Sequence, residues 1–375
     1  MSHVVEGFVQ PRFDAVRTVF AEALATGEEL GARFTVRIGG EVVVDLWGGH
    51  ADRARTQPFT DRHIAPVYST TKAVTALMIA RLVDQGKLDY EQTVASIWPE
   101  FAVAGKADIT IGQLLSHQAG LPGFVPPQSP EIWFDPKAVC DTLAAQAPMW
   151  EPGTGSGYHP VSGGYLIGEV FRRVDGRTVG AALRDDLCGP LGIDFFIGTP
   201  ESEDHRVAEM QKPTAAVDLG TIDPIKRAAF LDKGSAPAGR GSADWRRMEI
   251  PSANGHGTAL ALAQLMGIVA TGGWCGETRI LSLSTIAQAT RERVVGQDKV
   301  LPYRLSWGAG FLRNTGLEAY GPHPRAVGHS GWGGSCALAD PDKALSAGYV
   351  MTRQSIHLLR DPRPLRLIAA LYSAL

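Results

Sequence analysis

Strand-like sequence lies at both ends of this 375-residue chain, and this placement is the strongest constraint on its fold. Near the N-terminus, two apolar runs at 32–38 and 41–47 are separated only by Gly39-Gly40. Two glycines between such runs predict a tight hairpin, because both turn positions need positive φ. Further runs of this kind lie near the C-terminus, at 307–313, 334–340 and 344–353. Both chain ends are therefore expected to contribute strands.

The sequence between these strands is mostly helical. Apolar residues recur at helical spacing in segments 111–116, 138–146, 163–174, 179–187, 260–271 and 284–292. Two more helices are expected near the chain ends, over 11–26 and 364–375. This pattern predicts an α+β fold, in which helices flank one antiparallel sheet built from both chain ends. The expected domains are 1–85 with 300–375, and a large, mostly helical insertion 86–299, with the active site at their junction.

Composition excludes several classes of protein. Hydrophobic residues make up 44% and charged residues 20% of the chain, which is typical of a globular protein. The formal net charge is −3 and no basic run occurs, so neither nucleic acid nor a membrane is an expected partner. The sequence shows no secretory signal pattern and no apolar stretch of about 18 residues. Because the four cysteines are widely spaced, we expect reduced thiols and a cytoplasmic protein.

A Ser-x-x-Lys pattern, Ser69 to Lys72, opens a strongly apolar helical segment that Gly86 is expected to end. Residues three apart lie on the same side of a helix, so Lys72 is expected to face Ser69. A serine hydroxyl is a poor nucleophile until a base takes its proton, and a lysine can be that base when burial lowers its pKa. Backbone N–H groups at the same helix end can stabilise an oxyanion. The pattern predicts a serine nucleophile with a lysine base.

Three blocks together resemble the serine β-lactamase-like superfamily, which includes penicillin-binding proteins, class C β-lactamases and family VIII carboxylesterases. The blocks are Ser69-Thr70-Thr71-Lys72, the segment PGTGSGY from Pro152 to Tyr158, and His329-Ser330-Gly331-Trp332-Gly333-Gly334. They are similar to the family's S-x-x-K, its segment leading to a catalytic tyrosine, and its K-T-G. Segment 111–121, IGQLLSHQAGL, is similar to a further helix-and-turn block. The resemblance covers most of the chain and implies the β-lactamase/transpeptidase-like fold.

The resemblance also implies roles for single residues. It makes Ser69 the nucleophile, Lys72 its base and Tyr158 the group that passes the proton to the leaving group. The phenol needs a lowered pKa for that role, and Lys72 is the expected source of positive charge. The implied oxyanion hole consists of the backbone N–H groups of Ser69 and Trp332. The expected substrate-binding residues are His329, Ser330, Gly331, Trp332 and Phe124, the last with a place in the core as its alternative.

Two positions depart from the β-lactamase pattern. Tyr158 is followed by His159-Pro160, where β-lactamases carry an asparagine two residues beyond the tyrosine, so the amide that contacts a β-lactam is absent. His329 replaces the lysine of K-T-G, and an unperturbed histidine is mostly neutral at pH 7, so binding of a substrate carboxylate is weakened. Both changes favour neutral esters. The Trp-Gly-Gly form of the third block is also typical of family VIII carboxylesterases.

Other kinds of site find little support in the sequence. Residues 328–332 approach the G-x-S-x-G pattern of α/β-hydrolases, but the fifth position is Trp332 and too little chain follows for the remaining catalytic residues. No HExxH, no Walker loop and no GxGxxG after a strand occurs, so neither a metal nor a cofactor is expected. Segment 201–253 is rich in Pro, Gly and charge, and it is expected to be either a lid or a surface excursion.

The sequence therefore predicts a carboxylesterase that hydrolyses small short-acyl esters through an acyl-enzyme on Ser69. Three alternatives stay open. An acyltransferase passes the same acyl group to an alcohol or amine instead of water. A β-lactamase or D-amino-peptide hydrolase uses the same residues on an amide. A non-catalytic ligand-binding or scaffold protein shares only the fold, and the presence of Ser69, Lys72 and Tyr158 counts against it. The oligomeric state is left open.

Overall fold

The computed structural model describes residues 5–375, so the first four residues of the predicted 1–85 segment lie outside it. Within this range, nine strands form one antiparallel sheet in the order β1-β3-β2-β14-β13-β12-β11-β10-β9. Their bounds are Val5–Val9 (β1), Gly31–Ile38 (β2), Glu41–Gly49 (β3), Val294–Gln297 (β9), Arg304–Trp307 (β10), Leu312–Arg313 (β11), Val327–Ser330 (β12), Cys336–Asp340 (β13) and Leu345–Met351 (β14). The two chain ends meet where β2 pairs with β14. The predicted sheet from both ends is confirmed.

Smaller strands lie outside this sheet. Strands β4 (Ala65–Tyr68), β6 (Gly255–Gly257) and β5 (Phe195–Phe196) pair in that order, and β7 (Trp274–Cys275) pairs with β8 (Thr278–Arg279). The strand β4 matters for the site, because it leads directly into the Ser69 turn.

Thirteen α-helices lie in the described range, most of them between β4 and β9. They are α1 (Asp14–Ala25), α2 (Thr71–Asp84), α3 (Val94–Ile97), α4 (Ile111–Leu115), α5 (Pro136–Ala145), α6 (Ser162–Asp175), α7 (Val179–Leu183), α8 (Gly189–Leu191), α9 (Pro224–Lys226), α10 (Ala243–Arg247), α11 (Ala259–Ala270), α12 (Leu283–Thr290) and α13 (Pro362–Tyr372). None of the helices in the described range is long and apolar enough to cross a membrane.

Glycines decide two local features that bear on the predictions. Gly39 and Gly40 have φ of 59° and 90°, as the predicted tight hairpin between β2 and β3 requires. The single strand predicted over 307–313 is wrong, because the chain turns at Gly310, which has φ of 82°, and forms β10 and β11 instead. An apolar run with a glycine inside it thus becomes a hairpin.

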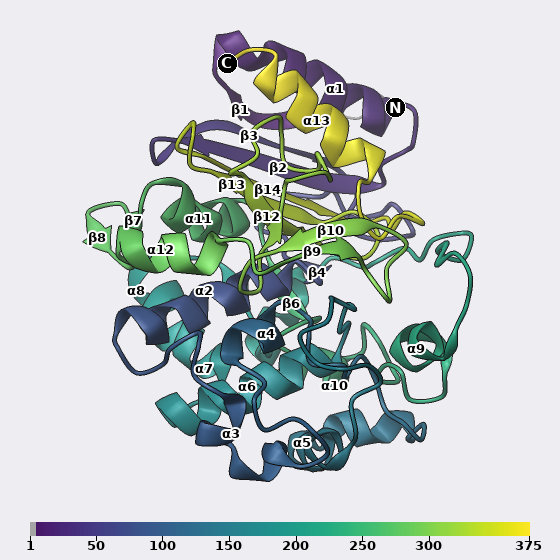
Figure 1. Ribbon diagram of the computed structural model, residues 1–375. Coiled ribbons are helices and arrows are strands. Elements are labelled where there is room, and N and C mark those ends of the chain that lie inside the picture. Colours follow the sequence, from purple (N-terminus) through teal and green to yellow (C-terminus); the bar gives the residue numbers. More distant parts are fainter. Residues whose placement is uncertain (1–4) are drawn as a thin grey trace.

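The large sheet is covered on both faces (Figure 1). Helices α1 and α13 pack together on one face, and α11 lies against β14, β2 and β13 on the other. The residues of β14 are accordingly all buried, which explains a nearly continuous apolar strand where a one-sided sheet would alternate. Gly348 in β14 permits the close approach of α11, because a Cβ there would lie 2.2 Å from the carbonyl oxygen of Ala259.

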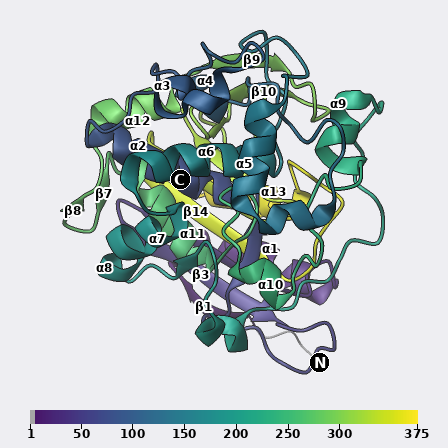
Figure 2. The same ribbon diagram turned by 90° about the horizontal axis from the view of Figure 1, so that it is seen from below.

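The other half of the molecule is helical and holds α3 to α7 (Figure 2). Helix α2 lies between this half and the sheet, and its residues from Thr71 to Ala80 are all buried. A helix buried on every side needs apolar or small residues all round, as this sequence has. Two elements from the range 86–299 belong with the sheet instead of the helical half: β9 extends its edge and α11 covers its face.

Candidate active site

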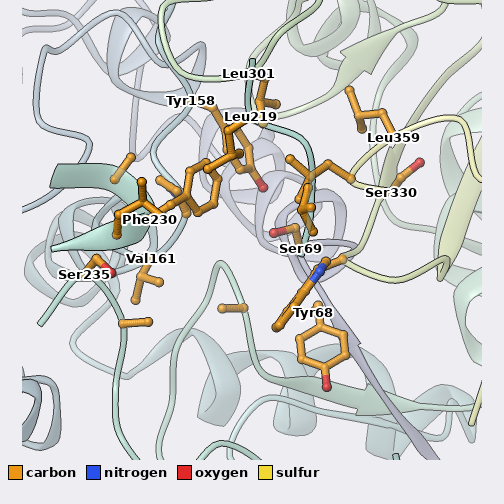
Figure 3. A pocket seen from close by; sticks show the side chains of 18 of the residues that line it. Tyr68, Ser69, Tyr158, Val161, Leu219, Phe230, Ser235, Leu301, Ser330 and Leu359 are labelled. Carbon is orange, nitrogen blue, oxygen red and sulfur yellow. The ribbon is translucent and has the colours of Figure 1, made fainter. Parts of the chain in front are cut away.

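Ser69 lies in the sharp turn between the end of β4 and the start of α2. Tyr68 has φ of 45°, which is uncommon for a residue with a side chain and holds the turn tight. The Thr71 hydroxyl donates to the carbonyl of Tyr68, and the Thr70 hydroxyl lies 3.1 Å from that of Ser335. These contacts hold the turn against the end of the sheet, with Ser69 in the wall of a cavity (Figure 3).

The side chain of Lys72 is buried directly beside Ser69. Its Nζ lies 3.3 Å from Ser69 Oγ, and it donates to the backbone carbonyls of Pro160 at 2.8 Å and Ser252 at 2.9 Å. No carboxylate within residues 5–375 pairs with it, and burial holds the pKa of Lys72 well below its usual value of 10.5. A neutral amine has two hydrogens and one lone pair. The two carbonyls accept the hydrogens, which leaves the lone pair for the Ser69 proton.

Tyr158 completes the group that the three sequence blocks predict. Its ring centre lies 4.5 Å from Lys72 Nζ, and a hydrogen bond joins its hydroxyl to Ser69. The expected lowering of its pKa by Lys72 is not found. Burial raises the pKa of Tyr158 above its usual value of 10.0, because no solvent stabilises a phenolate there. Tyr158 is therefore a neutral hydroxyl, which can accept one proton while it donates another.

Asp298 fixes the position of Tyr158, although it is not among the predicted site residues. Its buried carboxylate accepts hydrogen bonds from the Ser156 hydroxyl at 2.8 Å and the Tyr158 backbone N–H at 3.0 Å. It also accepts from the N–H groups of Val300 and Leu301, both at 2.9 Å. The bonds to Val300 and Leu301 form a local turn that any loop aspartate can make, and this turn is the only signal for Asp298 in the sequence around it. The sequence contains no pattern that links Asp298 to Tyr158, which lies 140 residues earlier in the chain.

The third block, His329 to Gly334, begins in the last two residues of β12 and lies beside the Ser69 turn. His329 is 1% exposed, and its Nδ1 lies 2.8 Å from the carbonyl oxygen of Ser330. Burial lowers the pKa of His329 to about 3, so the ring is neutral and supplies no cation where K-T-G proteins carry lysine. His329, Ser330 and Trp332 line the cavity, whereas Gly331 does not. A Cβ on Gly331 would lie 2.2 Å from both Ser335 Oγ and the Val67 carbonyl, so the glycine serves close packing.

The backbone N–H groups of Ser69 and Trp332 are free to bind a ligand. Within residues 5–375 neither donates a hydrogen bond to a protein acceptor. Free N–H groups beside a nucleophile are what a developing oxyanion needs. Their positions agree with the predicted oxyanion hole, whose function remains a prediction.

Two further histidines pack behind Tyr158. His117 and His159 stack with ring centres 5.5 Å apart, and His117 also meets the Tyr158 ring at 4.9 Å. Burial lowers the pKa of His117 well below its usual value and that of His159 to about 3. Both rings are neutral, so they add no positive charge near Lys72. His117 comes from segment 111–121, whose resemblance to a family block implied no role for it.

The cavity beside Ser69 has a volume of about 280 Å³ and mostly apolar walls (Figure 3). Segment 201–253 supplies half of the residues that line it, namely Ala216, Val217, Leu219, Ala229, Phe230, Leu231, Ser235, Ala236, Pro237, Arg240, Trp245 and Ala253. The segment is therefore part of the cavity wall, and its action as a lid stays a prediction. Phe124 does not line the cavity. It is 2% exposed and its ring packs against Trp133. The structure therefore places Phe124 in the core, which was its alternative, and not in the substrate cavity.

One group of metal-type ligands occurs in the described range, and it is separate from this cavity. It consists of His323, Asp340 and Asp342. Asp340 is already bonded to His323 and to the Tyr372 hydroxyl, and Asp342 pairs with Arg325. These contacts account for the cluster as a structural one near the C-terminal helix.

Comparison with known proteins identifies the family. A profile described as Beta-lactamase matches residues 16–371, and the chain belongs to this family. A protein named Esterase/beta-lactamase LipL, from Mycobacterium tuberculosis (strain ATCC 25618 / H37Rv), is 33% identical over 362 residues, which cover 93% of this chain and 83% of the relative.

Two solved structures extend the likeness to the whole fold. A penicillin-binding protein homologue from Caulobacter crescentus is 56% identical with a TM-score of 0.97, over 99% of this chain and 100% of that one. A family VIII carboxylesterase is 42% identical with a TM-score of 0.93, over 99% and 100% of the two chains. The β-lactamase/transpeptidase-like fold is confirmed, and the chain is a serine hydrolase.

Proposed function

We propose that the protein is a carboxylesterase that hydrolyses short-acyl esters through an acyl-enzyme on Ser69. The contact between Lys72 Nζ and Ser69 Oγ, 3.3 Å long and backed by two carbonyls that hold the amine, carries this proposal. Relatives named esterase and carboxylesterase support the ester as the substrate class. The apolar cavity of about 280 Å³ supports a small acyl or alcohol group.

The proposed reaction has two halves. Ser69 Oγ attacks the ester carbonyl while its proton passes to Lys72, and the carbonyl oxygen becomes an oxyanion facing the Ser69 and Trp332 N–H groups. Tyr158 donates its hydroxyl proton to the leaving alcohol oxygen and regains a proton from Lys72. In the second half a water molecule attacks the acyl-enzyme and gives up a proton along the same route. The carboxylic acid leaves and Ser69 recovers its hydrogen.

The proposal is tested with p-nitrophenyl butyrate and a pair of serine variants. Ser69→Ala is expected to reduce p-nitrophenol release to the rate without enzyme. Ser235→Ala, which alters another serine in the wall of the same cavity, serves as the matched control and is expected to stay within about threefold of wild type. Equal rates for wild type and Ser69→Ala would refute the assignment. Mass spectrometry after brief incubation with ester is expected to show the acyl group on Ser69 only in wild type.

β-Lactam hydrolysis is the second candidate, because one relative's name joins esterase with beta-lactamase. Neutral His329 offers no cation to a β-lactam carboxylate. Pro160 offers no side-chain amide, and its carbonyl is bonded to Lys72. We therefore expect kcat/KM for nitrocefin to be at least about a hundredfold below that for p-nitrophenyl butyrate. Comparable values would move the proposed function to β-lactam hydrolysis. Adding an alcohol acceptor and analysing products separates hydrolysis from acyl transfer.

A further inference from the structure

Arg240 stands between two hollows of the surface. It lines the apolar cavity that contains Ser69, and it also lines a neighbouring groove of about 790 Å³. Its guanidinium lies 4.6 Å from the centre of the Trp332 ring, so the aromatic face holds it in place. Tyr68, Pro237 and Trp332 also border both hollows, so the groove adjoins the cavity.

The charge of Arg240 is not neutralised by the protein. Four cationic side chains border the groove, and two of them have carboxylate partners: Arg53 pairs with Glu209, and Arg246 with Asp204. Within residues 5–375, neither Arg240 nor Lys212 forms an ion pair. In a protein with a net charge of −3, two uncompensated cations on one groove beside the nucleophile favour an anionic ligand.

We propose that Arg240, with Lys212, forms a subsite for a carboxylate carried by the ester substrate, several bonds from the scissile carbonyl. This inference rests on the proposed esterase function. Trp332 sets the spacing, because its backbone N–H faces the expected oxyanion while its ring lies under Arg240. An apolar part of the substrate occupies the cavity, and its charged end reaches past Trp332 into the groove. The anion site thus lies on segment 201–253 instead of at His329, where the ring is neutral.

Two ester pairs test the subsite and show which end of the substrate carries the charge. Mono-p-nitrophenyl glutarate against p-nitrophenyl butyrate adds a carboxylate to the acyl side, and 4-acetoxybenzoate against phenyl acetate adds it to the leaving group. For at least one pair, Arg240→Ala is expected to lower the ratio of kcat/KM, charged over neutral, at least about fivefold, as for a lost charge-assisted hydrogen bond. The ratio for Arg240→Lys is expected to lie between those of wild type and Arg240→Ala. Raising the salt from low to about 0.5 M is expected to reduce the wild-type ratio.

Arg12→Ala is the matched control. Arg12 is also an exposed arginine stacked on an aromatic ring, 4.4 Å from the centre of Phe13, but it lies outside both hollows. The ratio of kcat/KM, charged over neutral ester, is expected to be the same in Arg12→Ala as in wild type. Unchanged ratios in Arg240→Ala for both ester pairs would overturn the subsite and leave the esterase proposal intact.

A binding measurement separates the subsite from catalysis. Calorimetry on Ser69→Ala protein is expected to show 4-phenylbutyrate binding more tightly than 4-phenylbutanol, with the difference lost when Arg240→Ala is added. Equal affinity for the two ligands would overturn the subsite whether or not any ester is hydrolysed. Absence of Ser69-dependent ester hydrolysis, in contrast, would overturn the proposed function alone.

Discussion

The Nζ atom of Lys72 lies 4.5 Å from the ring centre of Tyr158, and burial shifts the pKa values of these two groups in opposite directions. The pKa of Lys72 falls well below its usual value and that of Tyr158 rises above its own. Burial therefore favours the uncharged form of both side chains before substrate binds. Charge appears only when Ser69 gives up its proton, next to a neutral phenol able to pass that proton on.

The pH dependence of the reaction follows from these shifts. Lys72 acts as a base when deprotonated, so kcat/KM is expected to rise with pH through its lowered pKa and to become level before the pH reaches the ordinary lysine value of 10.5. His159 and His329, each with a pKa of about 3, add no step near neutral pH. Initial rates with p-nitrophenyl butyrate across this range provide the test. A rate that keeps climbing toward the ordinary lysine value of 10.5 would contradict it.

Replacing Lys72 is expected to remove most of the activity. Lys72→Ala is expected to lower kcat/KM at least about a thousandfold, because the base and its nucleophile act as a unit. Lys72→Arg is expected to do the same, since a guanidinium does not give up its proton at these pH values. Lys106→Ala is a close control: its Nζ also donates to two backbone carbonyls, of Val103 and Gln146, away from the cavity. It is expected to lose stability but retain kcat/KM, and a loss matching that of Lys72→Ala would argue against a specific base.

Asp298 is expected to act as a positioning residue for Tyr158. In Asp298→Asn an NH₂ group replaces either Oδ1, which accepts three backbone N–H groups, or Oδ2, which accepts the Ser156 hydroxyl, so at least one donor loses its acceptor. We expect kcat to fall at least about tenfold with a smaller change in KM, because proton transfer through Tyr158 suffers more than substrate binding. Steady-state kinetics measure both quantities.

Asp340→Asn gives the control for a purely structural loss. Asp340 is also fully buried and accepts several hydrogen bonds, outside the cavity. Both variants are expected to lose about 1–3 kcal/mol in the free energy of unfolding. If Asp340→Asn lowers kcat as much as Asp298→Asn does, the positioning role fails.

Glu29 is expected to make stability depend on pH. It is buried with Arg363 and Asp361, where one guanidinium balances one of the two carboxylates. Burial raises the pKa of Glu29 to about 8 from an ordinary value of 4.5. The folded state therefore holds a proton that the unfolded state releases above 4.5, so the stability from this group falls as pH rises through about 8. Melting temperatures from pH 5.5 to 8.5 are expected to decline less in Glu29→Gln than in wild type; parallel curves would contradict this.

Some of these features can be predicted from local sequence and others cannot. The Gly39-Gly40 hairpin, the helix after Ser69 and the Ser69-to-Lys72 spacing all depend on neighbours in the chain, so their patterns were sufficient. The carbonyls of Pro160 and Ser252 that hold Lys72 have no side-chain signal, because every residue has a carbonyl.

Two expectations about side chains fail for the same physical reason. Burial determines the pKa of Tyr158 and places Phe124 in the core, and burial depends on what other segments pack there. The break of 307–313 into two strands had a visible signal in Gly310, which the apolar run obscured.

The pairing of β2 with β14 also sets the order of events during synthesis. Ile38 pairs in register with Leu345, which is synthesised roughly 300 residues later. At roughly 5–20 residues per second, that is tens of seconds during which the β2–β3 hairpin has an open, apolar edge on the ribosome. The Ser69 turn rests on Ser335, so the nucleophile is formed late as well. The nascent chain is thus exposed to aggregation, and to chaperones, well before it has an active site.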